Sequence, residues 1–122
     1  ADYTQALAVR DEMMTTLERF LDGWDAWLCP VTVGSAFTHR PSGEWLEVDA
    51  RRVPYMEGTS GLPSLFNLTG HPVVTLPLRR SPHEPLPLGV QVVGRRWGDE
   101  ALLSVAEALA DVTGPFQPPP GV

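Results

Sequence analysis

The stretch Leu65–Gly94, LFNLTGHPVVTLPLRRSPHEPLPLGVQVVG, decides the fold of this chain. Two apolar runs within it, Pro72–Leu78 and Leu86–Val93, have the length and the β-branched content of strands. Between them, Ser81-Pro82 and Glu84-Pro85 interrupt a hydrogen-bonded ladder and indicate a reversal of the chain. Neither run alternates cleanly between apolar and polar residues. The sequence therefore predicts a hairpin covered on both faces, as in the middle of an α/β sheet.

A further strand and a short helix are predicted ahead of this hairpin. Asp25–Thr32 is short and largely apolar, which favours a buried strand with Asp25 as a turn or cap residue. Thr59–Gly70 is predicted to form the short helix, with Ser60 as its N-cap and Pro63 early in its first turn. Gly70 would end that helix.

Two longer helices are predicted at the two ends of the chain. Tyr3–Asp22 repeats apolar residues at three- and four-residue steps, and Gly23 stands where a left-handed cap would end the helix. The last helix is predicted to begin with Asp99 as its N-cap and to end at Thr113-Gly114-Pro115. Its apolar residues fall on one face.

The expected architecture is a single α/β domain over residues 1–115, followed by a proline-rich tail at 116–122. We expect a small mixed sheet of about three strands, the hairpin included. Two long helices and one short helix would flank it. A chain of 122 residues is long enough for one core and too short for a large enzyme with a deep pocket.

Composition excludes several classes of function. The net charge of −6 argues against a nucleic-acid partner, because there is no basic surplus to displace counterions from phosphates. No apolar run is long enough to span a membrane. Cys29 is the single cysteine, and its apolar neighbours favour a buried thiol in a reducing cytoplasm. The sequence begins with Ala1 and not with an initiator Met, so we expect the chain to begin inside a longer one.

The segment 34–60 is long, polar and broken by proline and glycine, which is uncommon in a compact domain unless the segment has a role. It carries four aromatic or imidazole side chains that would line a pocket or an interface: Phe37, His39, Trp45 and Tyr55. Ordinary loop packing is the alternative interpretation.

Three polar residues near the hairpin are further candidates. His71 would sit at the mouth of a strand and is a candidate pocket residue, or a turn histidine satisfied by backbone. Gln91 falls within a strand of buried character, where an amide must find partners. Asn67 precedes the first strand. We expect Asn67 and Gln91 to hold backbone groups of a neighbouring segment, including one that this chain does not contain.

Several ordered motifs resemble the C-terminal portion of the amidase signature family. They are Tyr3, Ala6, Leu7 and Arg10 in the first helix, Phe66–Pro72 (FNLTGHP), Leu76-Pro77, and Leu86–Gly94 (LPLGVQVVG). In that family an N-x-T/S-G-x-P turn leads into a strand, and a G-L-P-x-G-x-Q strand and a closing helix follow. The stretch Asp25–Thr32 resembles the family's D-x-L-L-x-P-T segment, but Val31 follows Pro30 where the family has threonine.

The resemblance implies amide hydrolysis by a serine that a second serine and a lysine activate, with a Gly/Ser-rich loop for the oxyanion. All nine basic residues of this chain are arginine, so it contains no lysine to act as that base. The Gly58–Gly61 cluster lacks the Ser-Ser-Gly-Gly-Ser character. We therefore expect no catalytic residue, no metal site and no cofactor in this chain. His39, His71 and His83 lie too far apart in sequence for a zinc motif.

Two interpretations remain open. In the first, the chain is the non-catalytic C-terminal portion of an amidase, inactive alone. An apolar sheet surface would then be covered by the missing N-terminal portion or by self-association, and the loop aromatics and His71 would wall the substrate pocket. In the second, it is a stand-alone binding or scaffold protein derived from an amidase, with the aromatic loop as its binding surface.

Overall fold

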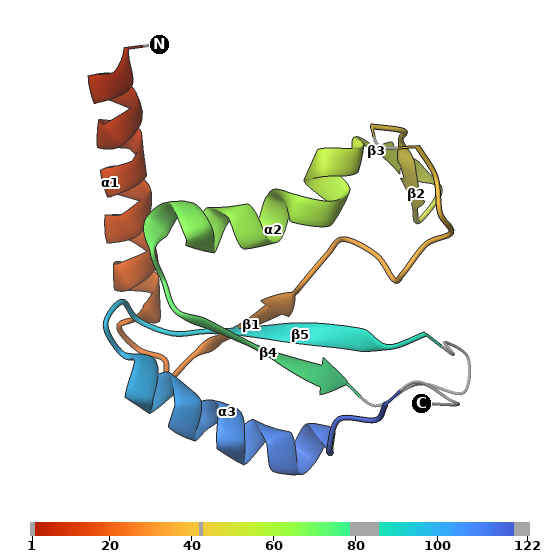
Figure 1. Cartoon of the computed structure of the whole chain (residues 1–122). Coiled ribbons are helices and arrows are strands. Elements are labelled where there is room, and N and C mark those ends of the chain that lie inside the picture. The colour runs from red at the N-terminus through yellow and green to blue at the C-terminus, as the bar shows by residue number, and fades with distance from the viewer. Residues whose placement is uncertain (1, 42, 79–85, 119–122) are drawn as a thin grey trace.

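A computed structural model describes residues 2–41, 43–78 and 86–118 of the chain (Figure 1). In chain order the elements are α1 (Tyr3–Leu21), β1 (Trp27–Pro30), β2 (Leu46–Val48), β3 (Arg51–Val53), α2 (Tyr55–Thr69), β4 (Val73–Leu78), β5 (Leu88–Val93) and α3 (Asp99–Thr113). The proline-rich turn of the predicted hairpin, His83 and the last four residues of the tail lie outside the described residues.

The main sheet has three strands in the order β1-β5-β4, so β5 is central. β4 and β5 pair as neighbours in antiparallel register, with Thr75 opposite Gln91, which confirms the predicted hairpin. β1 pairs antiparallel with the other edge of β5 and places Cys29 opposite Gln91. The prediction of a mixed sheet is wrong in this respect, because both pairings are antiparallel. The β1 prediction is right in place, but β1 is a half-buried edge strand.

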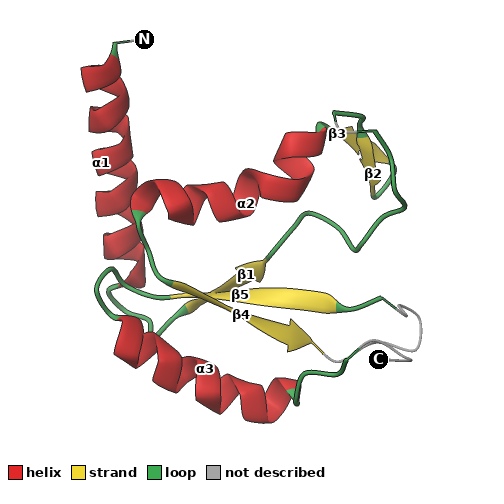
Figure 2. Ribbon diagram, viewed as in Figure 1, coloured by secondary structure: helices red, strands yellow, loops and turns green. Residues whose placement is uncertain are grey.

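The sheet lies between α3 and α2 (Figure 2). α3 covers one face, where a cluster of Leu76, Val92, Leu102 and Ala106 forms the core. The C-terminal end of α2 covers part of the other face with Phe66, packed against Cys29 and Val93. An edge-to-face stack continues this contact from Phe66 to Trp27, with ring centroids 5.6 Å apart. The sequence therefore predicted correctly that helices cover both faces, but α2 covers its face only in part.

The middle helix is longer than predicted. α2 has 15 residues, the same as α3, and it begins at Tyr55 rather than near Thr59. Pro54 occupies the N-cap with extended backbone, and Gly58 N–H donates to its carbonyl at 2.9 Å, which opens the helical ladder. Ser60 lies inside the helix and caps nothing. Pro63 is also interior, where it removes one ladder hydrogen bond.

The segment 34–60 contains a two-stranded hairpin, β2–β3, that the sequence did not indicate. Its turn uses Asp49 and Ala50 at φ 48° and 61°, the left-handed pair of a type I′ turn. Turns of this type usually carry Asp-Gly, but here Ala50 takes the place of the glycine. Because alanine rarely adopts a positive φ, the sequence contains no signal for this turn. The hairpin packs on α2 at Gly58, where a Cβ would meet Leu46 Cδ1 at 2.7 Å. A side chain at this position would therefore have to displace the end of the Leu46 side chain.

The predicted caps of the two terminal helices need correction. Gly23 is not left-handed. Instead, the backbone N–H of Asp22 donates to Arg19 O and caps α1. Gly98 is the N-cap of α3, and Asp99 is its first helical residue. α3 does end as predicted, with Gly114 at φ 85°.

Large apolar side chains remain exposed on the described surface, including Tyr3, Trp24, Met56 and Trp97. The chain exposes 8999 Å² in all, whereas a folded monomer of 13.3 kDa is expected to expose about 6,500 Å². Figure 1 shows one reason, since the N-terminal half of α1 projects away from the other elements. None of the helices in the described part of the chain has the length and hydropathy to cross a bilayer.

Candidate functional site

Arg40 connects the predicted aromatic residues of the loop. The rings of Phe37 and Tyr55 meet edge to face, with centroids 6.1 Å apart. The guanidinium of Arg40 lies 5.5 Å from the Phe37 ring centroid, and its Nη1 donates to the carbonyl of Trp45 at 3.0 Å. Arg52 stacks on the Trp45 ring at 5.3 Å. The structure thus brings Phe37, Trp45 and Tyr55 into one cluster, held by two cation–π contacts.

Two cavities share the segment 32–37 as a wall. The smaller has a volume of 290 Å³ and places Phe37 and Arg40 beside Glu47 and Asp49 of the hairpin. The larger is an open groove of 710 Å³ along the sheet, with Thr75 and residues of β1 and β5 as its floor. Phe37 lines both cavities. The groove occupies the part of the sheet face that α2 leaves uncovered.

Not all predicted site residues join this cluster. His39 is exposed and lines neither cavity. His71 lies at the junction of α1, α2 and β4 with its side chain fully buried, so it cannot wall an open pocket as predicted. Arg40 is the residue that sequence reasoning missed. A cation placed between Phe37 and Trp45 in the chain was the available signal, because arginine stacks readily on aromatic faces.

The cavities have the chemistry of a binding surface. Arg40 lines the smaller cavity, and its Nε is buried with no hydrogen-bond partner among the described residues. The hydroxyls of Thr32 and Ser35 line the walls, but no described wall residue is a histidine or lysine that could activate them. Burial raises the pKa of the Cys29 thiol, although the hydrogen bond from Gln91 partly opposes this. A raised thiol pKa suits a buried hydrophobe rather than a nucleophile.

Gln91 and Asn67 have different surroundings. The Gln91 amide is buried and donates from Nε2 to the carbonyl of Pro30 at 2.9 Å, and it lies 3.7 Å from Cys29 Sγ. It therefore ties the edge strand β1 to the centre of the sheet. Asn67 is exposed and belongs to the last turns of α2 rather than to a turn before β4.

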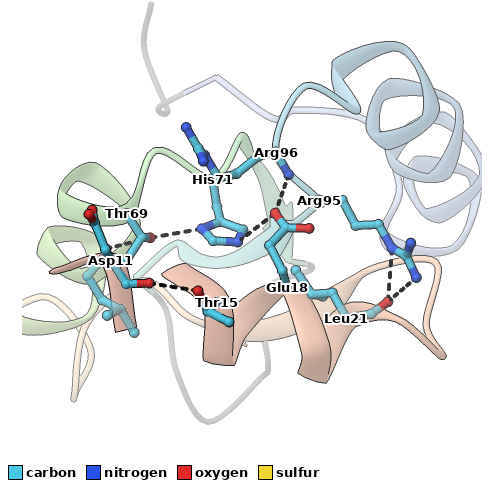
Figure 3. A network of polar contacts seen from close by, with 9 residues as sticks. Asp11, Thr15, Glu18, Leu21, Thr69, His71, Arg95 and Arg96 are labelled. Atoms are coloured by element: carbon cyan, nitrogen blue, oxygen red, sulfur yellow. Dashed lines mark hydrogen bonds and ion pairs between the residues drawn. The ribbon is translucent and has the colours of Figure 1, made fainter. Parts of the chain in front are cut away.

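A hydroxyl, an imidazole and a carboxylate stand in a row between α1 and α2 (Figure 3). Thr69 Oγ1 lies 2.9 Å from His71 Nδ1, and His71 Nε2 lies 3.2 Å from Glu18 Oε1. This row resembles a nucleophilic triad in composition. However, Thr69 is 1% exposed and its hydroxyl is also within 2.9 Å of the Leu65 carbonyl, so no substrate can reach it. The row is structural.

Burial has the largest effect on the His71 imidazole and lowers its pKa below the ordinary value of 6.5. The Glu18 carboxylate raises the pKa and the Arg96 guanidinium lowers it, and the net direction is downward. His71 is therefore neutral at pH 7. Within the described residues, no group of three or more His, Cys, Asp or Glu side chains is placed to hold a metal ion.

A family model described as Amidase matches residues 1–103. The chain belongs to the amidase family. The A subunit of the mitochondrial glutamyl-tRNA(Gln) amidotransferase of Ixodes scapularis is 34% identical over 108 residues, which are 88% of this chain and 20% of that protein. The corresponding glutamyl-tRNA(Gln) amidotransferase protein of Nocardia farcinica (strain IFM 10152) is 31% identical over 93% of this chain and 22% of its own length. These matches confirm the resemblance inferred from the motifs.

Two further similarities agree with this assignment. The AtzE subunit of 1-carboxybiuret hydrolase from Pseudomonas sp. (strain ADP) is 27% identical over 89% of this chain and 23% of that protein. A solved structure described as a crystal structure of amidase superposes with a TM-score of 0.76 at 31% identity, covering 92% of this chain and 25% of that one. The chain thus spans about a fifth to a quarter of the length of these relatives.

Proposed function

We propose that this chain is the C-terminal, non-catalytic portion of an amidase, and that amide C–N bond hydrolysis belongs to the longer protein. One observation carries the proposal: nearly all of this chain matches relatives of which it covers 20% to 25%. The absence of lysine supports it, because the family's general base must then come from another segment. Alone, this chain is expected to be inactive.

Within the longer protein, the proposed role of the chain is to wall the substrate pocket. Phe37 supplies an apolar wall common to both cavities, and Tyr55 holds its ring in place. Trp45 and His39 lie on the same exposed segment and would complete the rim. His71 has no place in this wall. It instead fixes the packing of α1.

The exposed apolar surface of the chain indicates what kind of partner we propose for it. Large apolar side chains, among them Trp24, Leu28 and Phe37, remain exposed in the described residues, and such a surface is typical of one that a partner covers. The proposed occupant is the N-terminal portion of the amidase, docked on the open sheet groove. Self-association through the same surface is the alternative. The free, buried Cys29 supports a reducing, cytoplasmic location for the assembly.

Ammonia release from a panel of simple primary amides tests the proposal. The 122-residue chain alone should give no release above buffer, while the natural gene product purified from its source should turn over at least one amide. In that gene product, Phe37→Ala should raise KM, and Leu103→Ala, a similar truncation on the exposed face of α3, should leave it unchanged. Turnover by the chain alone would contradict the proposal.

The second candidate function is a stand-alone binding module that uses the Arg40 cavity. The position of Arg40 in the wall of a 290 Å³ cavity favours it, since a ligand with an acceptor group could pair with a charged guanidinium there. Sedimentation of the isolated chain discriminates the two. A folded monomer that stays dispersed at high concentration favours the module, and association or aggregation favours the amidase portion.

A further inference from the structure

The Thr69–His71–Glu18 row joins three elements and takes no part in the proposed pocket. Glu18 is on α1, Thr69 ends α2, and His71 precedes β4 (Figure 3). The Glu18 carboxylate also accepts the backbone N–H of Arg96 at 3.0 Å, which holds it in position against the imidazole. The row is therefore the polar centre of the contact that fastens α1 to the body of the chain.

The single proton of the Thr69 hydroxyl has two acceptors within reach. The carbonyl of Leu65 and Nδ1 of His71 are each 2.9 Å from Oγ1. A hydroxyl can donate to one of them at a time. Which acceptor receives the proton depends on whether Nδ1 of His71 carries a proton of its own.

The carboxylate of Glu18 determines the tautomer of the neutral imidazole. An ionised carboxylate only accepts, so a lone pair on Nε2 at 3.2 Å would repel it, and the proton of neutral His71 belongs on Nε2. The Nε2–H points off the line to Oε1, so the attraction is mainly electrostatic. Nδ1 is then an acceptor, and Thr69 donates to it.

Protonation of His71 reverses this hydrogen bond. Nδ1–H must now donate, so the Thr69 oxygen accepts it and the hydroxyl proton turns to the Leu65 carbonyl. The contact between Nε2 and Glu18 becomes an ion pair. The Thr69 hydroxyl and Nδ1 of His71 thus remain hydrogen-bonded to each other in both states, and Nε2 faces the Glu18 carboxylate in both.

We propose that the Thr69 hydroxyl is a proton-dependent rotor, which keeps α1 fastened to the α2–β4 junction whether His71 is neutral or charged. The groups that face the imidazole are few. Glu18 approaches from α1, the Arg96 guanidinium from the segment after β5, and α2 presents the Thr69 hydroxyl. Neighbouring Arg95 is directed to Leu21 O and Asp22, at the end of α1.

The rotor is tested by titrating the histidine ring nitrogens of the chain by 15N NMR. Above the titration midpoint, wild-type His71 should show the Nε2–H tautomer. Thr69→Val should move the midpoint to lower pH, because the charged form loses a stronger hydrogen bond than the neutral form does. Thr69→Ser keeps a hydroxyl and should titrate as the wild type.

Glu18→Gln provides the second arm. Its amide oxygen can still accept from Arg96 N, but the charge that favours imidazolium is gone, so the midpoint of His71 should fall and the Nε2–H tautomer should lose its dominance. An Nδ1–H tautomer in the neutral wild-type protein overturns the proposal, and so does an unchanged midpoint in Thr69→Val. The tautomer measurement needs no variant, so a folding defect cannot obscure it.

Discussion

Replacing Arg95 by alanine should weaken the attachment of the C-terminal end of α1. Arg95 donates from Nε and Nη2 to the carbonyl of Leu21 at 3.1 and 2.9 Å, and Nη2 also lies 3.0 Å from Asp22 Oδ1. Leu21 is fully buried, so its carbonyl depends on protein donors, and besides Arg95 the backbone N–H of Trp24 donates to it at 3.1 Å. Arg95 therefore caps α1 from a segment distant in sequence.

The two parts of this contact have different expected magnitudes. A charged donor on a buried carbonyl is worth about 1.5–3 kcal/mol, and partial exposure of Arg95 reduces this to about 1–2 kcal/mol. The pair with Asp22 is mostly exposed, at 80% of the Asp22 side chain, and such pairs contribute about 0–0.5 kcal/mol. The carbonyl contact should dominate the loss.

Urea denaturation followed by tryptophan fluorescence measures both parts. Arg95→Ala should lower the free energy of unfolding by about 1–2 kcal/mol, which moves the midpoint by roughly 0.5–1 M. Asp22→Asn is the matched control and should cost less than about 0.5 kcal/mol. If Asp22→Asn costs as much as Arg95→Ala, the ion pair and not the carbonyl cap holds α1, and the reasoning is refuted.

Three further outcomes are expected. Leu102→Ala should cost about 2–5 kcal/mol in urea melts because the side chain is buried against the sheet, while exposed Leu103→Ala should cost about 0.5 kcal/mol or less; equal losses would contradict the core assignment. The free energy of unfolding should fall as pH drops below 6.5, because the unfolded chain protonates His71 before the native protein does, and His71→Gln should flatten that fall. Cys29 should react with iodoacetamide in the native protein far more slowly than in urea, since burial raises its pKa; fast native alkylation would show an accessible thiolate.

The sequence predicted those parts of the fold in which local chemistry and tertiary packing agree. Prolines separate the two apolar runs that form β4 and β5, and the periodic face of α3 ends at Gly114. Family motifs in the same stretch led to the correct family. These elements pack on their sequence neighbours, so their local pattern is sufficient.

The remaining features depend on partners distant in the sequence. The β2–β3 turn places Ala50 at a positive φ, which no local preference of alanine indicates. Pro54 starts α2 earlier than Ser60 suggests, and Gly58 in the first turn of the helix packs against Leu46 of the hairpin. His71 was predicted to be a pocket residue because its partner, Glu18, lies on another helix and could not be inferred from spacing.

The mass of the natural gene product tests the central claim most directly. An antibody raised against this chain, followed by intact-mass analysis of the captured protein from source-cell lysate, gives that mass without any assumption about activity. The account predicts a product several times larger than 13.3 kDa, since the chain covers 20% to 25% of the length of its relatives. A natural product of 13.3 kDa would contradict it and would establish a small protein that retains part of the amidase fold without the catalytic residues.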